Sequence, residues 1–266
     1  MIEVVVWGKQ GYETVPIKDE YEEIWSRMEW IRVIKKNKNH ILVLIHDPIT
    51  SGLFVLTVQN INMKNNKVLS HTSPFMITEY ARWKTKSYHL IVSEYCQKGN
   101  LNDLLTRNHC IEESRMQFMA AQLVVALHQL HLQHQVYRHL EMKNVMLFKK
   151  DIIKLKSSSS KYNTAPEEKS IGNNNATMSG DWWAMGILMY QCLTGNRFKE
   201  EEEMKMFPLI FPPHLSESAC DFVENLLQVD PLRRLGTNDI FDVYHHSFFT
   251  HIDFEVLLCK AKGEIL

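Results

Sequence analysis

The sequence predicts an α+β fold in which a small β-rich lobe precedes a larger α-helical lobe. Two observations carry this prediction. Short β-branched runs separated by turn residues fill the chain up to about residue 95, and helical patterns follow from about residue 114. At 266 residues, the chain is long enough to form two lobes.

Three apolar runs predict strands in the first part of the chain. HILVLIHD (40–47) and GLFVLTVQNI (52–61) are rich in β-branched residues, and the Asp-Pro and Ser-Gly pairs between them favour a hairpin. YHLIVSEY (88–95) is the third run. Residues 1–28 precede these strands as an extension. Its apolar start, VVVW, suits either an extra edge strand or a self-association surface.

Apolar residues at spacings of three and four predict two helices that pack on one side, over 114–131 and 216–228. A third helix is predicted over 181–195, where DWWAMGILMYQCLTG is apolar nearly all round and should be buried. Asp181 is suited to cap its start, and Gly195 stands where the helix should end.

Composition excludes several classes of protein. The net charge of −1 gives no reason to expect a nucleic-acid partner, and no apolar run reaches the roughly 18 residues of a membrane span. The five cysteines form no C-x-x-C pair, which favours reduced thiols over disulfides or zinc ligands. The N-terminus lacks the pattern of a secretory signal. We therefore expect a soluble cytoplasmic protein, with the nucleus left open.

Ten stretches then occur in an order typical of one family. They are IRVIKKNKNHILVLI, GLFVLTV, SPFM, LIVSEYCQKGNL, VYRHLEMKNVML, DIIKLK, APE, DWWAMGILMYQCLTG, VDPLRRLG and HSFFTHIDF. From about residue 30 to residue 254, they resemble the Ser/Thr protein kinases of the AGC class, and they look nearest to its ribosomal-protein-kinase relatives.

The resemblance implies a bilobal protein-kinase-like fold. It places an N-lobe at 29–95 and a C-lobe at 96–254, after the extension at 1–28 and before a truncated C-terminal tail at 255–266. The regulatory helix of the N-lobe should be reduced, because the segment between the third strand and SPFM is short and contains no Glu.

The resemblance also locates the nucleotide-binding positions, and none keeps its usual residue. Lys35, Asn37 and His40 replace the three glycines that let the loop backbone approach the phosphates. Thr57 replaces the phosphate-anchoring lysine. Of the nucleotide site, only the hinge backbone at Glu94, Tyr95 and Cys96 remains to meet an adenine.

The catalytic positions are altered as well. In the catalytic loop, His139 replaces the aspartate and Glu141 replaces the lysine that steadies the transferred phosphoryl group. Ser157 replaces the metal-binding aspartate, and a serine hydroxyl is a poor ligand for Mg²⁺. Asn144 is retained, and we expect it to hydrogen-bond the loop rather than to hold a metal.

The residues that the resemblance assigns to structure are all present. Glu167 and Arg234 should form the family's buried salt bridge, and Asp181 should anchor the backbone of the catalytic loop, where Arg138 keeps its place. Four catalytic requirements fail together, and the loss of one such group alone often costs two to four orders of magnitude in rate.

We therefore predict a pseudokinase that acts in intracellular signalling, as a scaffold or allosteric partner of an active kinase or of its substrate. Tyr80, Trp83 and the 96–105 segment are predicted to contribute to docking. No cofactor is expected. One alternative is an ATP- and Mg²⁺-dependent Ser/Thr kinase with His139 as base and Asn144 at the metal. Another is a degenerate paralogue without a retained function.

One further pattern involves histidines at 128, 131 and 134, which have helical spacing. A metal site would need all three on one helix face, and the third position is rotated well away. The prediction is three surface histidines that flank the apolar stripe, with no metal.

Overall fold

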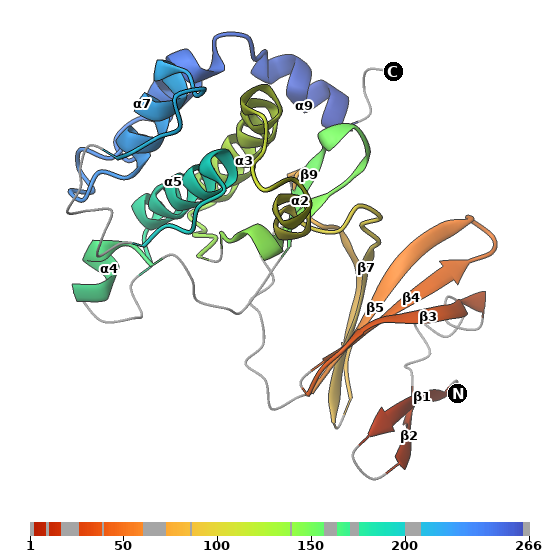
Figure 1. Cartoon of the computed structure of the whole chain (residues 1–266). Helices are drawn as coiled ribbons and strands as arrows, with labels where there is room; N and C mark the ends of the chain where they lie inside the picture. The colour runs from red at the N-terminus through yellow and green to blue at the C-terminus, as the bar shows by residue number, and fades with distance from the viewer. Residues whose placement is uncertain are drawn as a thin grey trace. The chain divides into compact units, whose positions relative to one another are not determined.

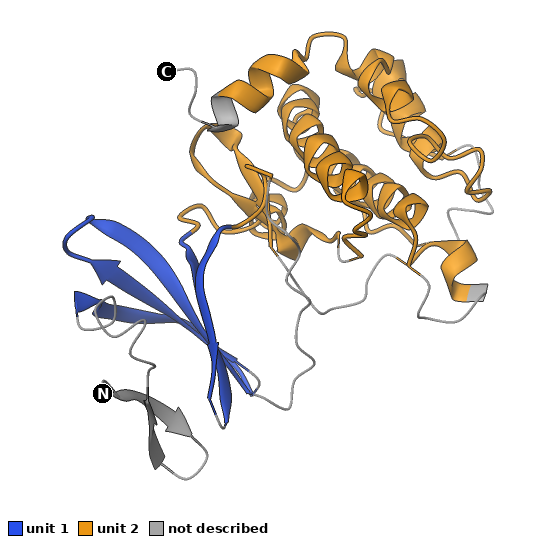
Figure 2. Cartoon of the chain, turned by 180° about the vertical axis from the view of Figure 1, so that it is seen from behind, with its two compact units in different colours: residues 1–65, 78–95 blue, residues 66–77, 96–266 orange. Residues whose placement is uncertain are grey.

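The computed structural model describes residues 3–8, 11–16, 27–38, 40–60, 73–85, 87–138, 140–156, 164–170, 176–199 and 209–262. The chain divides into two compact units, 1–65 with 78–95 and 66–77 with 96–266 (Figure 2). The division after Tyr95 falls at the predicted lobe boundary. Residues 73–77 differ from the prediction, because they group with the larger unit.

The smaller unit is built on one antiparallel sheet of five strands (Figure 1). Its strands are β3 (Glu29–Lys36), β4 (His40–Asp47), β5 (Gly52–Asn60), β6 (Glu79–Lys84) and β7 (Tyr88–Glu94), in the spatial order β3-β4-β5-β7-β6. The predicted hairpin and third strand are confirmed. Strand β6 was not predicted, because the charged residues in EYARWK hide its alternation.

The apolar side chains of this sheet gather on one face. The buried residues there are Val43, Ile45, Leu56, Val58, Trp83, Leu90 and Val92. Trp83 is only 6% exposed, so its predicted role in docking is wrong, whereas Tyr80 on the same strand is exposed. Trp83 packs in the core because its position in β6 turns it toward the buried face.

A separate hairpin lies in the extension. β1 (Glu3–Gly8) pairs antiparallel with β2 (Gly11–Pro16), and the two form a sheet of their own. The predicted apolar start is therefore a strand. Its described partner is β2 and not the edge of the five-stranded sheet.

The larger unit is mainly helical and confirms the second half of the fold class. Its principal helices are α2 (Leu101–Asn108), α3 (Glu113–Leu132), α5 (Met178–Thr194), α7 (Glu217–Leu226) and α9 (Phe254–Lys262). The short elements are η2 (Met142–Asn144), β8 (Val145–Leu147), η3 (Lys149–Asp151), β9 (Ile153–Leu155), α4 (Pro166–Ser170), α8 (Phe241–Tyr244) and η5 (Ser247–Phe249).

Helix α5 forms the centre of the larger core. Fourteen of its 17 residues are buried, as the apolar sequence predicts. Gly195 ends it in the left-handed conformation with φ of 74°, which confirms the predicted stop. The predicted cap is wrong. Thr177 caps the helix by accepting a hydrogen bond from the Gly180 N–H, and Asp181 lies in the first turn.

Other helix ends follow local sequence rules. Ser216 caps α7 through the N–H of Ala219, and Asn100 forms a capping box with Asp103 at the start of α2. Helix α9 covers most of the range that was predicted as a tail. Among the residues that the structure describes, no helix is both long and apolar enough to cross a bilayer.

Candidate functional site

Thr57 lies in the middle of β5, at the position that the resemblance assigns to the phosphate-anchoring lysine. Its cross-strand neighbours are Leu42 on β4 and Ile91 on β7. Residues directly opposite each other in a sheet share a face, so Thr57 stands between two apolar side chains. Neither neighbour carries a charge that could hold a phosphate.

A cationic residue stands at each end of this cross-strand row. Lys35 pairs with Leu42 on one side, and Arg82 pairs with Ile91 on the other. The Arg82 guanidinium is already engaged, because it donates to both carboxylate oxygens of Glu79 at 2.7 and 2.8 Å. Lys35 lies two strands away from Thr57, which is about 10 Å at the usual strand spacing.

Hydrogen bonds between Asn37 and His40 close the β3–β4 connection, to which the resemblance assigns the glycine loop. The backbone N–H of Asn37 donates to the carbonyl of His40 at 3.0 Å, and the His40 N–H donates to Asn37 Oδ1 at 2.9 Å. Asn37 Nδ2 lies 3.2 Å from His40 Nε2. The polar groups of Asn37 and His40 therefore bond to one another, at two of the positions that the resemblance assigns to the glycine loop.

Each side of the hinge is fixed within its own unit. In the smaller unit, Glu94 accepts a hydrogen bond from the Thr78 N–H at 2.8 Å, and the Glu94 N–H donates to the Thr78 carbonyl. In the larger unit, the buried Cys96 thiol donates to the Leu147 carbonyl. Tyr95, between them, is half-buried.

Asp181 holds the backbone of the catalytic loop. Its carboxylate accepts hydrogen bonds from the N–H groups of Tyr137 and Arg138, each at 2.8 Å. His131 Nε2 lies 2.9 Å from the same carboxylate. Arg138 itself has a φ of 69°, a conformation that costs a non-glycine residue energy, and its side chain is exposed.

Tyr137 connects this loop to Lys156, the residue that follows β9. Its hydroxyl donates to the Lys156 carbonyl at 2.6 Å, and the side chain is fully buried. Burial raises the pKa of the phenol well above its usual value, and the negative charges of Asp181 and Glu141 raise it further. Tyr137 therefore stays neutral and acts as a structural donor.

The remaining loop residues bond to each other. Asn144 is buried, and its Nδ2 donates to the Glu141 carboxylate at 3.2 Å. The Lys156 N–H donates to the Asn144 carbonyl at 2.8 Å. The predicted positions His139 and Ser157, by contrast, lie outside the described residues, and so does most of the segment predicted as a reduced regulatory helix.

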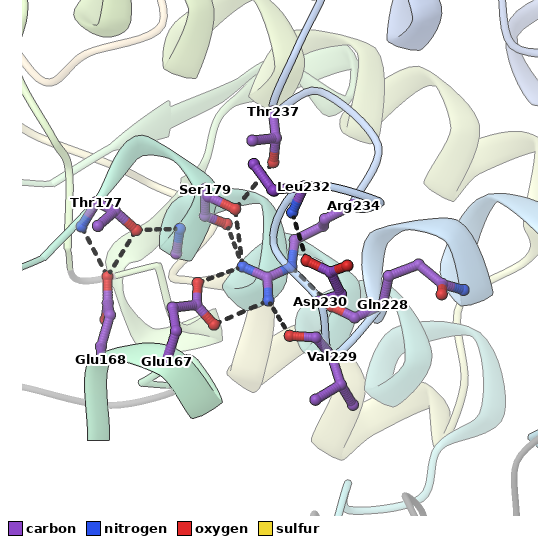
Figure 3. A network of polar contacts seen from close by, with 11 residues as sticks. Glu167, Glu168, Thr177, Ser179, Gln228, Val229, Asp230, Leu232, Arg234 and Thr237 are labelled. Carbon is purple, nitrogen blue, oxygen red and sulfur yellow. Dashed lines mark hydrogen bonds and ion pairs between the residues drawn. The ribbon is translucent and has the colours of Figure 1, made fainter. Parts of the chain in front are cut away.

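Arg234 is the centre of a buried polar network (Figure 3). Its guanidinium donates to the two carboxylate oxygens of Glu167 at 2.6 and 3.0 Å, and to the Ser179 hydroxyl at 2.9 Å. It also lies 5.1 Å from the centre of the Trp183 ring. The Arg234 side chain is fully buried and the Glu167 side chain is 17% exposed, so water screens this pair only weakly.

Glu168 is a polar residue of this network that was not predicted. Its Oε1 accepts hydrogen bonds from the Thr177 N–H at 2.7 Å and from the Thr177 hydroxyl at 3.2 Å (Figure 3). The sequence contains a signal for it, since a second acid directly follows the motif acid Glu167. Together, the two neighbouring acids attach α4 to Arg234 and to the start of α5.

The histidine prediction is only partly correct. His131 is mostly buried and contacts Asp181, and its ring packs edge-on against Trp182 at 5.6 Å. His128 lies 2.6 Å from the Tyr244 hydroxyl. Both therefore have structural partners and are not simple surface residues. Within the described ranges, no group of three His, Cys, Asp or Glu residues could hold a metal ion.

Comparison with known proteins now decides the family. The model of the protein kinase domain matches residues 57–249, which is more than half of the chain. The chain belongs to the protein kinase domain family. The match begins at Thr57 and includes the catalytic loop and the Glu167–Arg234 pair.

Similar proteins are named as Ser/Thr or developmentally regulated kinases. The kinase domain is 30% identical to developmentally-regulated protein kinase 1 of Dictyostelium discoideum over 77% of this chain and 32% of that protein. It is 29% identical to RAC-beta serine/threonine-protein kinase A of Xenopus laevis over 73% of this chain and 45% of that protein. For serine/threonine-protein kinase Sgk1 of Xenopus tropicalis, the values are 28%, 77% and 54%.

These relatives support an AGC-like kinase domain. The chain spans between about a third and about half of their length. The part that it shares with them is the kinase domain. The activity of the full-length relatives is not assigned to this chain.

Proposed function

We propose that this kinase domain is a pseudokinase, which binds a protein partner in intracellular signalling and does not transfer phosphate. The observation that carries the proposal is the environment of Thr57. It has no charge, and both cross-strand neighbours, Leu42 and Ile91, are apolar. Phosphoryl transfer needs a cation that holds the phosphates of ATP.

Two further features support the same conclusion. The turn at Asn37 and His40 is closed by its own hydrogen bonds, so its donors are engaged where a glycine loop would offer them to phosphate. In the larger unit, Glu141 stands where the resemblance assigns a lysine, and its carboxylate accepts a hydrogen bond from Asn144, which the resemblance assigns to a metal. A carboxylate there would repel the transferred phosphoryl group.

A second candidate function is an ATP-dependent Ser/Thr kinase with relocated chemistry. One observation favours it, because Lys35 stands in the cross-strand row of Thr57 and on the same face. A lysine side chain from β3 is long enough to approach the space beside Thr57. On this reading, Lys35 would supply the missing charge, and the relatives named as kinases would share their activity with this chain.

Thermal unfolding of the whole chain distinguishes the two. Samples without ligand, with ATP, with ATP and Mg²⁺, and with ATP and Mn²⁺ are compared. A ligand present at 100 times its dissociation constant adds about 2.7 kcal/mol of stability, which raises the Tm of a domain of this size by several degrees. We expect no shift in any sample, and no transfer of labelled phosphate to the chain or to a general Ser/Thr substrate.

The Lys35→Ala variant is the matched control. A shift in the wild-type protein that Lys35→Ala removes, together with phosphate transfer, would establish the second candidate and reject the pseudokinase. The variant Thr57→Lys restores the usual cation on β5. If the other losses matter as proposed, this single change leaves phosphate transfer undetectable.

A further inference from the structure

Strand β3 differs from the other strands of its sheet in its exposure. All eight of its residues, Glu29–Lys36, are exposed, although four of them are large and apolar: Trp30, Ile31, Val33 and Ile34. Among the described residues, β3 pairs with β4 on one side only. It is therefore an edge strand that presents backbone N–H and C=O groups together with apolar side chains.

The apolar residues of this edge continue the buried core. Val33 is opposite Val43, and Trp30 is opposite Ile45. Val43 and Ile45 are 2% and 0% exposed, whereas Val33 and Trp30 are 54% and 49% exposed. Because opposite residues share a face, the apolar layer of the sheet ends at β3 without a cover.

Edge strands of soluble proteins are usually protected by charged side chains, especially lysine, by proline or by a bulge, and the charged residues of β3 gather at its two ends apart from Arg32. β3 has two irregularities of register, between Trp30 and Arg32 and between Val33 and Lys35. The residues that fall between the register pairs are Ile31 and Ile34, so these positions bring apolar side chains and not charges. The bulges therefore do not protect the edge with polar groups.

The charged residues of β3 change from acidic to basic along the strand. The strand begins with Glu29, carries Arg32 near its middle and ends with Lys35 and Lys36. When two copies of such a strand pair antiparallel, the acidic start of each lies beside the basic end of the other. The centre of the pair then consists of the four apolar residues and Arg32, the only charge among them.

We propose that β3 is a self-association surface, through which two copies of this chain pair edge to edge into one continuous sheet. The occupant of the edge is thus a second copy of the chain. This inference is independent of the proposed function, because it concerns a strand edge and neither nucleotide nor phosphate transfer. It locates self-association at β3, whereas the sequence suggested such a surface only for the N-terminal extension.

Sedimentation velocity of the full chain over a range of concentrations tests the proposal, combined with hydrogen exchange of the β3 amides. We expect a dimer that dissociates on dilution, and slower exchange in β3 when the dimer forms. Val33→Lys, which adds a like charge to both copies at the centre, should weaken the dimer by about tenfold or more. Leu232→Lys is the matched control, because Leu232 is 70% exposed in the larger unit.

A charge exchange tests the antiparallel arrangement. Glu29→Lys or Lys35→Glu alone should weaken the dimer, and the double variant should restore it to within about threefold, since the opposite charges meet again. A chain that stays monomeric at all concentrations would overturn the proposal. So would a dimer that Val33→Lys leaves unchanged, or slow β3 exchange that does not depend on concentration, which would indicate cover from within the chain.

Discussion

The carboxyl group of Glu168 lies in the space that a side chain at residue 180 would fill, and Gly180 leaves this space open. A Cβ built on Gly180 would lie 2.7 Å from the carboxyl carbon of Glu168, a separation that side chains do not adopt. This glycine is in a helix and is needed for space, not for an unusual φ. Glu168 uses the space to bond Thr177, the residue that caps α5.

Gly180→Ala should therefore destabilise the protein, although alanine is a better helix former than glycine. The added methyl group displaces the Glu168 carboxylate, the end of a flexible side chain, from Thr177, and after the gain in helix propensity we expect a net loss of up to about 1 kcal/mol in the free energy of unfolding. Chemical denaturation of the full chain measures it. In the Glu168→Ala background the same glycine substitution should cost less, since the obstructing group is gone; equal costs would contradict this explanation.

Glu167→Gln should be among the more damaging single substitutions. It keeps the size of the side chain but leaves the charge of Arg234 buried without its counter-ion, which costs about 3–5 kcal/mol when one partner of a buried pair is removed. Denaturation midpoints report the loss. The comparison variant is Asp151→Asn, because Asp151 and its bidentate partner Arg115 are 36% and 33% exposed. Its cost should stay at about 1 kcal/mol or less.

Lys150→Gly should stabilise the protein. Lys150 has a φ of 56° in the β8–β9 turn and is exposed, so glycine relieves backbone strain without removing buried contacts. The expected gain is up to about 1 kcal/mol. Lys149→Gly, at the neighbouring exposed position, provides the reference, because Lys149 has no positive φ. A gain of the same size at both positions would exclude strain as the cause.

Stability should decrease in mildly acidic solution. Burial lowers the pKa of His128, and the neighbouring His131 lowers it further. The unfolded chain therefore binds a proton near pH 6.5 that the folded protein does not yet bind. Stability from this group is fully present above about pH 6.5 and is lost as the pH falls toward the lowered pKa.

The variant His128→Gln isolates that contribution. Glutamine can still bond the Tyr244 hydroxyl but does not titrate, so the dependence of unfolding free energy on pH between 5 and 7 should become shallower. Burial also lowers the pKa of His89 and His246, and part of the dependence will remain in the variant. An unchanged slope would show that His128 does not contribute.

The sequence predicted the fold class and the long helices because their apolar patterns are strong and local. It missed β6, whose charged residues hide the alternation, and it assigned Trp83 to a surface because one aromatic residue gives no sign of the face it occupies. The cap of α5 was misplaced by four residues for a related reason. Thr177 and Asp181 are both good capping residues, and only the tertiary contact with Glu168 decides between them.

For the candidate site, the sequence predicted which residues occupy the motif positions better than it predicted which residues they contact. The bond from Asn144 to Glu141 joins residues three apart, and the expectation that Asn144 bonds the loop agrees with it. The contact of His131 with Asp181 spans 50 residues. No local pattern encodes such a contact, because it depends on how α3 and α5 cross.

The buried residues of helix α5 serve the folding of the larger unit, whereas Thr57 and Asn37 lie outside that core. Fourteen residues of α5 are enclosed, so nearly every substitution there opens a void or forces a clash. The described part of the β3–β4 turn is exposed, and Thr57 is half-buried between the buried Leu56 and Val58. Substitutions at Thr57 or Asn37 should therefore disturb the packing of the chain less than substitutions within α5.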